Sequence, residues 1–159
     1  MKRTLTINSL NFLGKKMKVA GWVNSRRDHG KLIFIDLRDR SGTLQVVFKP
    51  DRIYSAAKKL KPEWVVSIEG EIKKRPKGTE NSEIRTGNVE MVAKKLEILS
   101  EAKTLPFELS QKKERVSEEL RMKYRYLDLR RQEMRENLAW RQKVIQFMRN
   151  FLEREGFIE

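Results

Sequence analysis

The sequence contains no cysteine and only one histidine, His29. The absence of cysteine excludes disulfides, thiolate zinc sites and a thiol nucleophile, and a single histidine leaves no Ser–His–Asp set. A Walker-type phosphate loop and an HExxH pattern are also missing. We therefore predict no catalytic residue and no metal site in this chain, and we expect it to be inactive as an enzyme on its own.

Long apolar runs are missing as well. No stretch approaches the ~18 apolar residues of a membrane-spanning helix. The first ten residues, MKRTLTINSL, lack the apolar core of a signal peptide. These features predict a cytoplasmic protein that makes no membrane contact.

Basic charge is what the chain has in excess. Of its 159 residues, 36 are Lys or Arg and 22 are Asp or Glu, which gives a formal net charge of +14. Residues 1–50 hold eleven Lys or Arg against three Asp or Glu, a net +8. Such an excess attracts polyanions, so we expect nucleic acid to bind the N-terminal third.

Alternating apolar residues in the first hundred positions predict a mainly β fold. The expected strands are residues 17–23, 31–38, 43–48, 63–72 and 88–99. Helical spacing after Pro50 predicts a short helix between the third and fourth strands. This order matches a five-stranded OB-fold barrel, which binds oligonucleotides on strands two and three and on the loops between strands one–two and four–five. Here those two loops are RRDHGK and RPKGTENSEIRTG.

The composition changes after residue 99, where a charged segment containing Pro106 is typical of a linker. Ser117, followed by two glutamates, predicts a helix start. A longer helix is expected from about Met134 to Glu155, with Gly156 ending it. We divide the chain into a barrel domain (1–103), an α-helical hinge region (104–131) and the start of another domain (132–159).

Phe34 is the most informative position of the second strand. Its neighbours Ile33 and Ile35 are expected to face the core, which places Phe34 on the opposite face. An aromatic ring there can stack on an unpaired base, worth ~1–3 kcal/mol. The alternative is that a loop or the rest of the chain covers the ring. Gln45, expected to point outward from the next strand, and the basic loop favour stacking.

Several charged residues surround this position. We expect phosphate contacts, or stacking through the guanidinium plane, from Arg26, Arg27, Lys31 and Arg75. The aspartates are expected to be structural, through local Asp36–Arg38 and Asp39–Arg40 ion pairs.

Three strings in the same order resemble the N-terminal part of bacterial-type aspartyl-tRNA synthetases. They are GWVNSRRDHGKLIFIDLRDRSGTLQVVF, GTENSEIRTGNVEM and SEELRMKYRYLDLRRQEMRENLAWRQKVIQFMRNFLEREGFIE. The resemblance implies an OB-fold anticodon-binding domain, a hinge and the start of a class II catalytic domain that ends inside motif 1. The full-length protein would then use ATP and Mg2+ to attach aspartate to tRNA(Asp), as a homodimer joined through motif 1. Motifs 2 and 3, which hold ATP and the adenylate, are absent here.

The resemblance also implies roles for individual residues. Phe34 would stack on the central uracil of the anticodon, and Gln45 would read the edge of that base. Glu90 would lie near the wobble guanine. Further anticodon contacts are implied for Arg27, Arg75, Thr79 and Asn81.

His29 leaves the tRNA specificity open. Enzymes of this family that charge only tRNA(Asp) often have leucine at this loop position. Histidine resembles the non-discriminating enzymes, which also aspartylate tRNA(Asn). The two anticodons differ at their third base, cytosine against uracil, and these bases present an amino donor and a carbonyl acceptor respectively.

Three other interpretations of the chain remain. The first is a free-standing OB-fold protein that coats single strands without sequence preference. The second is an interaction protein that pairs through the apolar stripe of residues 134–152. An asparaginyl or lysyl relative of the same subclass is the third.

Overall fold

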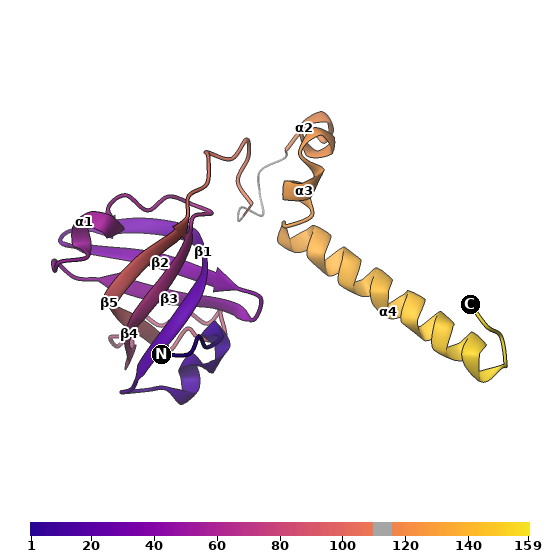
Figure 1. Cartoon of the computed structure of the whole chain (residues 1–159), viewed down its shortest axis with the longest axis horizontal. Coiled ribbons are helices and arrows are strands. Elements are labelled where there is room, and N and C mark those ends of the chain that lie inside the picture. Colours follow the sequence, from indigo (N-terminus) through magenta and orange to yellow (C-terminus); the bar gives the residue numbers. More distant parts are fainter. Residues whose placement is uncertain (110–115) are drawn as a thin grey trace. The chain divides into compact units, whose positions relative to one another are not determined.

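The computed structural model describes residues 1–109 and 116–159 and divides the chain into two compact units. The first unit is Met1–Thr104 and the second is Leu105–Glu159 (Figure 1). None of the described helices is long and apolar enough to cross a membrane.

The first unit is a closed five-stranded barrel with the strand order β1-β2-β3-β5-β4 (Figure 1). Its strands are β1 (Lys16–His29), β2 (Leu32–Asp39), β3 (Gly42–Phe48), β4 (Val65–Lys74) and β5 (Val89–Ser100). The β3–β5 pair is parallel and the other pairs are antiparallel. A 3-10 helix, η1 (Thr6–Asn11), precedes β1, and a short helix, α1 (Tyr54–Ala57), lies between β3 and β4. The predicted mainly β, OB-fold barrel is confirmed.

The alternation along β2 and β3 explains how the barrel forms. The predicted inward residues of β2 and β3 are all fully buried: Ile33, Ile35, Leu37, Leu44, Val46 and Phe48. β1 closes the barrel because its first half pairs with β4 and its second half with β2. Gly21 allows this change of partner, since a Cβ there would lie 2.2 Å from the carbonyl oxygen of Arg38.

The first strand is longer than the sequence predicted. We expected it to end at Val23, but it continues to His29, so most of the segment predicted as the loop RRDHGK is strand. His29 pairs directly with Leu32. Gly30 has a φ of 58°, which suits a two-residue hairpin turn. Because the hairpin is this tight, its basic residues are fixed by strand register rather than by a loose loop.

In its described residues, the second unit contains three helices: α2 (Glu118–Lys123), α3 (Arg125–Asp128) and α4 (Gln132–Arg154). The predicted helix start at Ser117 is confirmed, because its hydroxyl oxygen accepts a hydrogen bond from the Leu120 amide. The long helix ends before Gly156, whose φ is 85°. The buried apolar residues of this unit are Phe107, Leu109 and Leu127. No residue of α4 is buried.

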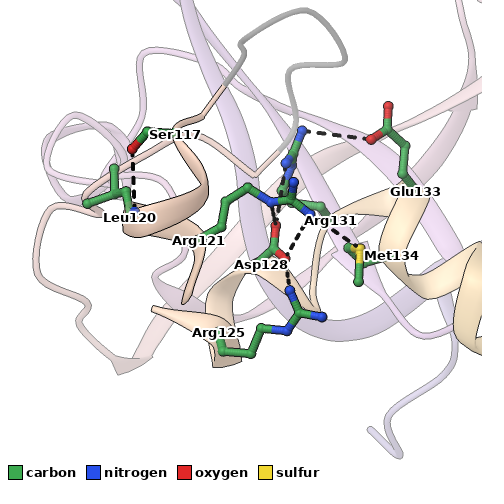
Figure 2. Close-up of polar contacts among 8 residues, drawn as sticks. All are labelled: Ser117, Leu120, Arg121, Arg125, Asp128, Arg131, Glu133 and Met134. Carbon is green, nitrogen blue, oxygen red and sulfur yellow. Dashed lines mark hydrogen bonds and ion pairs between the residues drawn. The ribbon is translucent and has the colours of Figure 1, made fainter. Parts of the chain in front are cut away.

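One fully buried carboxylate, Asp128, joins the three helices of this unit (Figure 2). Its Oδ1 accepts from Arg121 Nε at 2.9 Å and from Arg131 Nη1 at 3.4 Å, and its Oδ2 accepts from Arg125 Nη1 at 2.9 Å. Burial raises the pKa of Asp128, but the nearby arginines outweigh it, so the pKa lies below the ordinary value. Asp128 therefore stays ionised and holds α2, α3 and the residue before α4 together.

Candidate nucleic-acid interface

Phe34 lies on the outer face of β2, between two cross-strand neighbours. The register pairs it with Arg27 of β1 and with Val47 of β3, and directly opposed residues share one face of a sheet. Phe34 is half-buried, so its ring is not fully covered. The side chain of Arg27 is 58% exposed, whereas Val47 is buried. An accessible ring between a cation and an apolar neighbour is suited to stacking on a base.

The next row on this face contains Ser25, Asp36 and Gln45, which the register also places opposite one another. Arg27 Nη2 donates to both oxygens of Asp36, at 3.0 and 3.1 Å. Ser25 Oγ donates to Asp36 Oδ2 at 2.5 Å. The predicted Asp36–Arg38 pair is therefore wrong. The long Arg27 side chain reaches diagonally across the strand pair to the carboxylate, which diagonal neighbours in a sheet permit.

Arg38 and Asp39 also have other partners than predicted. Arg38 donates to Glu63, at 2.8 and 3.0 Å, and to Asn24 Oδ1 at 2.7 Å. Asp39 is buried and accepts hydrogen bonds from the backbone and hydroxyl groups of Thr6 and Ser41, so the predicted Asp39–Arg40 pair is wrong. Burial raises the pKa of Asp39, but together these hydrogen bonds lower it by more, so the pKa lies below its ordinary value.

Gln45 was expected to be exposed, yet it is 8% exposed and is bonded to Glu90. Gln45 Nε2 donates to Glu90 Oε2 at 2.8 Å. The two residues meet because β3 and β5 run parallel, with Val46 opposite Met91. The bond fixes the direction in which the Gln45 amide group points. Gln45 therefore presents an oriented donor and acceptor, which is what reading one base edge requires.

Arg75 is 6% exposed at the end of β4. Its Nε donates to the carbonyl oxygen of Val89 at 3.2 Å, and its Nη1 donates to that of Thr79 at 3.3 Å. Burial lowers the pKa of the Arg75 guanidinium, and the charges of Glu90 and Asp36 oppose that shift. Arg75 thus braces the β4–β5 loop from within and places positive charge near both carboxylates.

The β4–β5 loop, residues 75–88, is closely folded. Thr79 is exposed and its hydroxyl donates to the carbonyl oxygen of Pro76 at 2.8 Å. Asn81 is half-buried and its Oδ1 accepts from the Glu83 amide at 2.9 Å. A Cβ at Gly87 would lie 1.7 Å from the Asn81 carbonyl oxygen, so this close approach requires glycine. The loop holds Thr79 and Asn81 in defined positions.

Arg26 points away from the Phe34 row. It donates to both oxygens of Asp28, to the carbonyl oxygen of Leu60 at 3.2 Å and to that of Lys58. The hydrogen bond to Asp28 is the largest cause of the raised pKa of Arg26. These contacts attach the β1–β2 hairpin to the chain that follows α1, so Arg26 is committed within the barrel.

The structure brings together five of the predicted residues and separates others. The grouped residues are Arg27, Phe34, Gln45, Arg75 and Glu90. His29 and Lys31 are exposed at the tip of the hairpin. Asp36 was expected on this outward face beside Phe34 and Gln45, and the register places it there. Sequence reasoning missed Ser25, although its register opposite Asp36 follows once the hairpin turn is placed at Gly30. Among the described residues, no group of three or more His, Asp or Glu could hold a metal ion.

Family models match both units. The model described as "OB-fold nucleic acid binding domain" matches residues 17–99, and the one described as "tRNA synthetases class II (D, K and N)" matches residues 117–159. The chain therefore belongs to the OB-fold nucleic acid binding domain family. The second match disfavours a free-standing OB-fold protein.

Individual proteins similar to this chain include aminoacyl-tRNA synthetases for aspartate and asparagine. The chain is 55% identical over 150 residues to the aspartate–tRNA(Asp/Asn) ligase of Thermodesulfovibrio yellowstonii, covering 92% of this chain and 25% of that protein. Among solved structures, asparaginyl-tRNA synthetase from Pyrococcus horikoshii matches with 28% identity and a TM-score of 0.75, over 92% of this chain and 33% of that one. Aspartyl-tRNA synthetase from Entamoeba histolytica shares the fold, with a TM-score of 0.86 at 19% identity, over 99% of this chain and 38% of that one.

These relatives confirm the resemblance to aspartyl-tRNA synthetases. The chain spans about a quarter of the length of the curated relatives it matches.

Proposed function

We propose that this chain is the anticodon-reading part of an aspartate–tRNA ligase and that it binds the anticodon stem-loop of tRNA(Asp). The observation that carries the proposal is the placement of Phe34, half-buried on the outer face of the barrel, beside Arg27. Aromatic rings on such faces stack on single-stranded bases. The similarity to aspartate–tRNA(Asp/Asn) ligases supports the assignment to this RNA.

Reading the anticodon divides between position and sequence. The basic charge of the first third attracts the phosphates and sets position, whereas base contacts set sequence. Phe34 stacks on the central uracil. Gln45 then pairs its amide with the uracil edge, and Glu90 accepts from a wobble guanine. Arg27, Arg75 and the loop residues Thr79 and Asn81 complete the anticodon contacts, and Lys31 contacts phosphate.

The whole protein, of which this chain is a part, would aspartylate tRNA in the cytoplasm. ATP and Mg2+ would activate aspartate in the catalytic domain, and the ester would form at the 3′ end of the tRNA. The match of residues 117–159 to class II synthetases supports this reaction. We also propose that the whole protein is a homodimer that uses motif 1. The barrel's role is then to select the tRNA that the catalytic domain charges.

We further propose that tRNA(Asn) is accepted as well. His29 is exposed at the hairpin tip, where it can approach the third anticodon base. Curated relatives that are 47–55% identical to this chain are named aspartate–tRNA(Asp/Asn) ligase. Because the two anticodons differ only at that base, weak discrimination there extends binding to both.

Binding of the 159-residue chain to three anticodon stem-loops tests this function. The loops carry GUC, GUU or a scrambled anticodon, at one fixed moderate salt concentration. We expect GUC and GUU to bind with similar affinity and both more tightly than the scrambled loop. Phe34→Ala should weaken GUC binding on the order of 10- to 100-fold, the value of one base stack.

The matched control is Trp140→Ala, which removes an aromatic side chain that is 67% exposed on α4. It should leave all three affinities unchanged. Equal affinity for all three loops, unchanged in Phe34→Ala, would contradict anticodon reading. If the wild type prefers GUC over GUU, only the proposed acceptance of tRNA(Asn) is contradicted, and anticodon reading stands.

A further inference from the structure

We infer that Asp36, braced by Ser25, is a positioning residue that orients Arg27 for anticodon reading and so contributes to RNA selectivity. The inference rests on the proposed function and concerns the same face of the barrel. It replaces the local structural role that the sequence suggested for Asp36.

Asp36 holds the Arg27 guanidinium through one of its nitrogens. A single nitrogen, Nη2, donates to both oxygens of Asp36, at 3.0 and 3.1 Å. A guanidinium has five N–H donors, so this contact leaves most of them for another partner. The Arg27 side chain remains 58% exposed while it is held, and it lies opposite Phe34. An RNA base stacked on Phe34 would therefore meet a guanidinium whose direction is already set.

Asp36 is itself held in place. Ser25 Oγ donates to Oδ2 at 2.5 Å, and Ser25 lies directly opposite Asp36 in the register. The Asp36 side chain is 21% exposed, against 58% for Arg27. The more buried partner is the carboxylate, and the longer, more exposed side chain of Arg27 is oriented by it.

The charge of Asp36 partly offsets the burial of Arg75, but the hydrogen bonds of Asp36 do not hold the barrel together. Within the part of the chain that the structure describes, the hydrogen bonds of Asp36 go only to Ser25 and Arg27. Partly exposed ion pairs of this kind contribute little to stability. A negative charge on an RNA-binding face also repels phosphates and lowers affinity for every RNA alike. Preorganisation of Arg27 is the compensating effect, because a side chain held in its bound direction loses less entropy on binding.

The two effects of the carboxylate predict opposite results for Asp36→Asn. Loss of repulsion alone would raise affinity for cognate and scrambled loops by the same factor. Loss of orientation lowers the ratio of cognate to scrambled affinity, because only a specific complex uses the fixed direction of Arg27. The ratio therefore separates positioning from simple electrostatics.

The experiment measures binding of the full chain to the GUC and scrambled stem-loops, for wild type and Asp36→Asn. We expect the GUC-to-scrambled affinity ratio to fall about 10-fold in Asp36→Asn, a typical effect of losing one oriented charged contact. Ser25→Ala should lower the ratio in the same direction by less. Asp28→Asn is the matched control, since Asp28 lies on the same hairpin, is 53% exposed and pairs with Arg26. It removes the same charge and should leave the ratio unchanged.

A double-mutant cycle with Arg27→Ala completes the test. If Asp36 acts through Arg27, Asp36→Asn has no further effect on the ratio once Arg27 is removed. A wild type that prefers GUC, together with an Asp36→Asn variant of undiminished ratio, would overturn the inference and leave the proposed function standing. An equal loss in the Arg27→Ala background would also overturn it. A wild type without any preference would overturn the proposed function first.

Discussion

The barrel and the helical unit are stabilised in different ways. All five strands of the barrel contribute to one apolar core. Among its described residues, the helical unit buries the apolar side chains of Phe107, Leu109 and Leu127 together with the carboxylate of Asp128, and its longest helix buries none. A closely packed barrel holds surface side chains at fixed separations, whereas the helices share a small apolar cluster and one ionic cluster. The proposed reading of RNA sequence needs the fixed separations that the barrel provides.

The largest expected effect comes from a substitution in the barrel core, which should destabilise the barrel and leave the helical unit unchanged. Phe48→Ala removes a fully buried ring and should lower the free energy of unfolding of the barrel by about 4 kcal/mol. Hydrogen exchange resolved by mass spectrometry should show faster exchange throughout the strands and no change in α4. Faster exchange in both units to the same extent would contradict their independence. Val144→Ala, at a position 54% exposed on α4, is the control with little expected effect.

The second prediction concerns a substitution that should destabilise the helical unit and leave the barrel unchanged. Asp128→Asn leaves three arginines around a neutral, buried amide and should destabilise the helical unit by about 3 kcal/mol. The helix signal in circular dichroism should melt at lower temperature, while exchange in the strands stays unchanged. Glu133→Gln provides the control, because Glu133 is exposed and reaches Arg131 only at 3.9 Å. If the helices of Asp128→Asn melt at the wild-type temperature, the Asp128 carboxylate does not stabilise the helical unit, and apolar contacts alone hold it together.

Acid should lower the free energy of unfolding of both units, by less than the two substitutions above. Asp39 in the barrel and Asp128 in the helical unit have pKa values below the ordinary value of about 3.9. The unfolded chain therefore binds protons first as the pH falls, and stability present above about pH 4 is lost as the pH drops through the lowered pKa values. Urea unfolding followed between neutral pH and strong acid should show this loss. In Asp39→Asn the barrel should lose less stability over the same range, and an unchanged slope would contradict the role of Asp39.

The smallest effect concerns the start of α2. Ser117→Ala removes the hydroxyl that accepts from the Leu120 amide at 3.4 Å and should cost about 1 kcal/mol of helical-unit stability. Ser117→Asp should restore most of it, because aspartate is an equally good N-cap. Thermal melting of the helix signal distinguishes the two variants. If both melt like the wild type, the cap does not stabilise this unit.

Local patterns in the sequence predicted much of the barrel. The alternation in residues 31–38 identified the buried face of β2, and Phe34 was correctly placed on the other face. The end of β1 was mispredicted because polar, basic residues in a strand end resemble a loop. Their pairing with β2, in which Arg27 lies opposite Phe34 and His29 opposite Leu32, shows that these basic residues belong to the sheet.

Contacts between distant residues were beyond sequence reasoning. The Gln45–Glu90 bond joins residues 45 positions apart through a parallel strand pair. The Arg27–Asp36 contact depends on a register that the turn at Gly30 sets. Asp36 was assigned to Arg38 because the two are neighbours in the chain, but the long Arg27 side chain reaches Asp36 diagonally across the strand pair, and Arg38 pairs with Glu63 and Asn24 instead. Burial of Asp128 likewise depends on how three helices meet.

The most direct test of the central claim maps where RNA binds. Backbone and side-chain amide NMR signals of the full chain are followed as the GUC stem-loop is added. We expect changes around Arg27, Phe34, Gln45 and Glu90, including the Gln45 side-chain amide, and none along α4. Changes confined to α4, or to the Lys18–Glu69–Lys95 charge ladder of β1, β4 and β5, would contradict that claim.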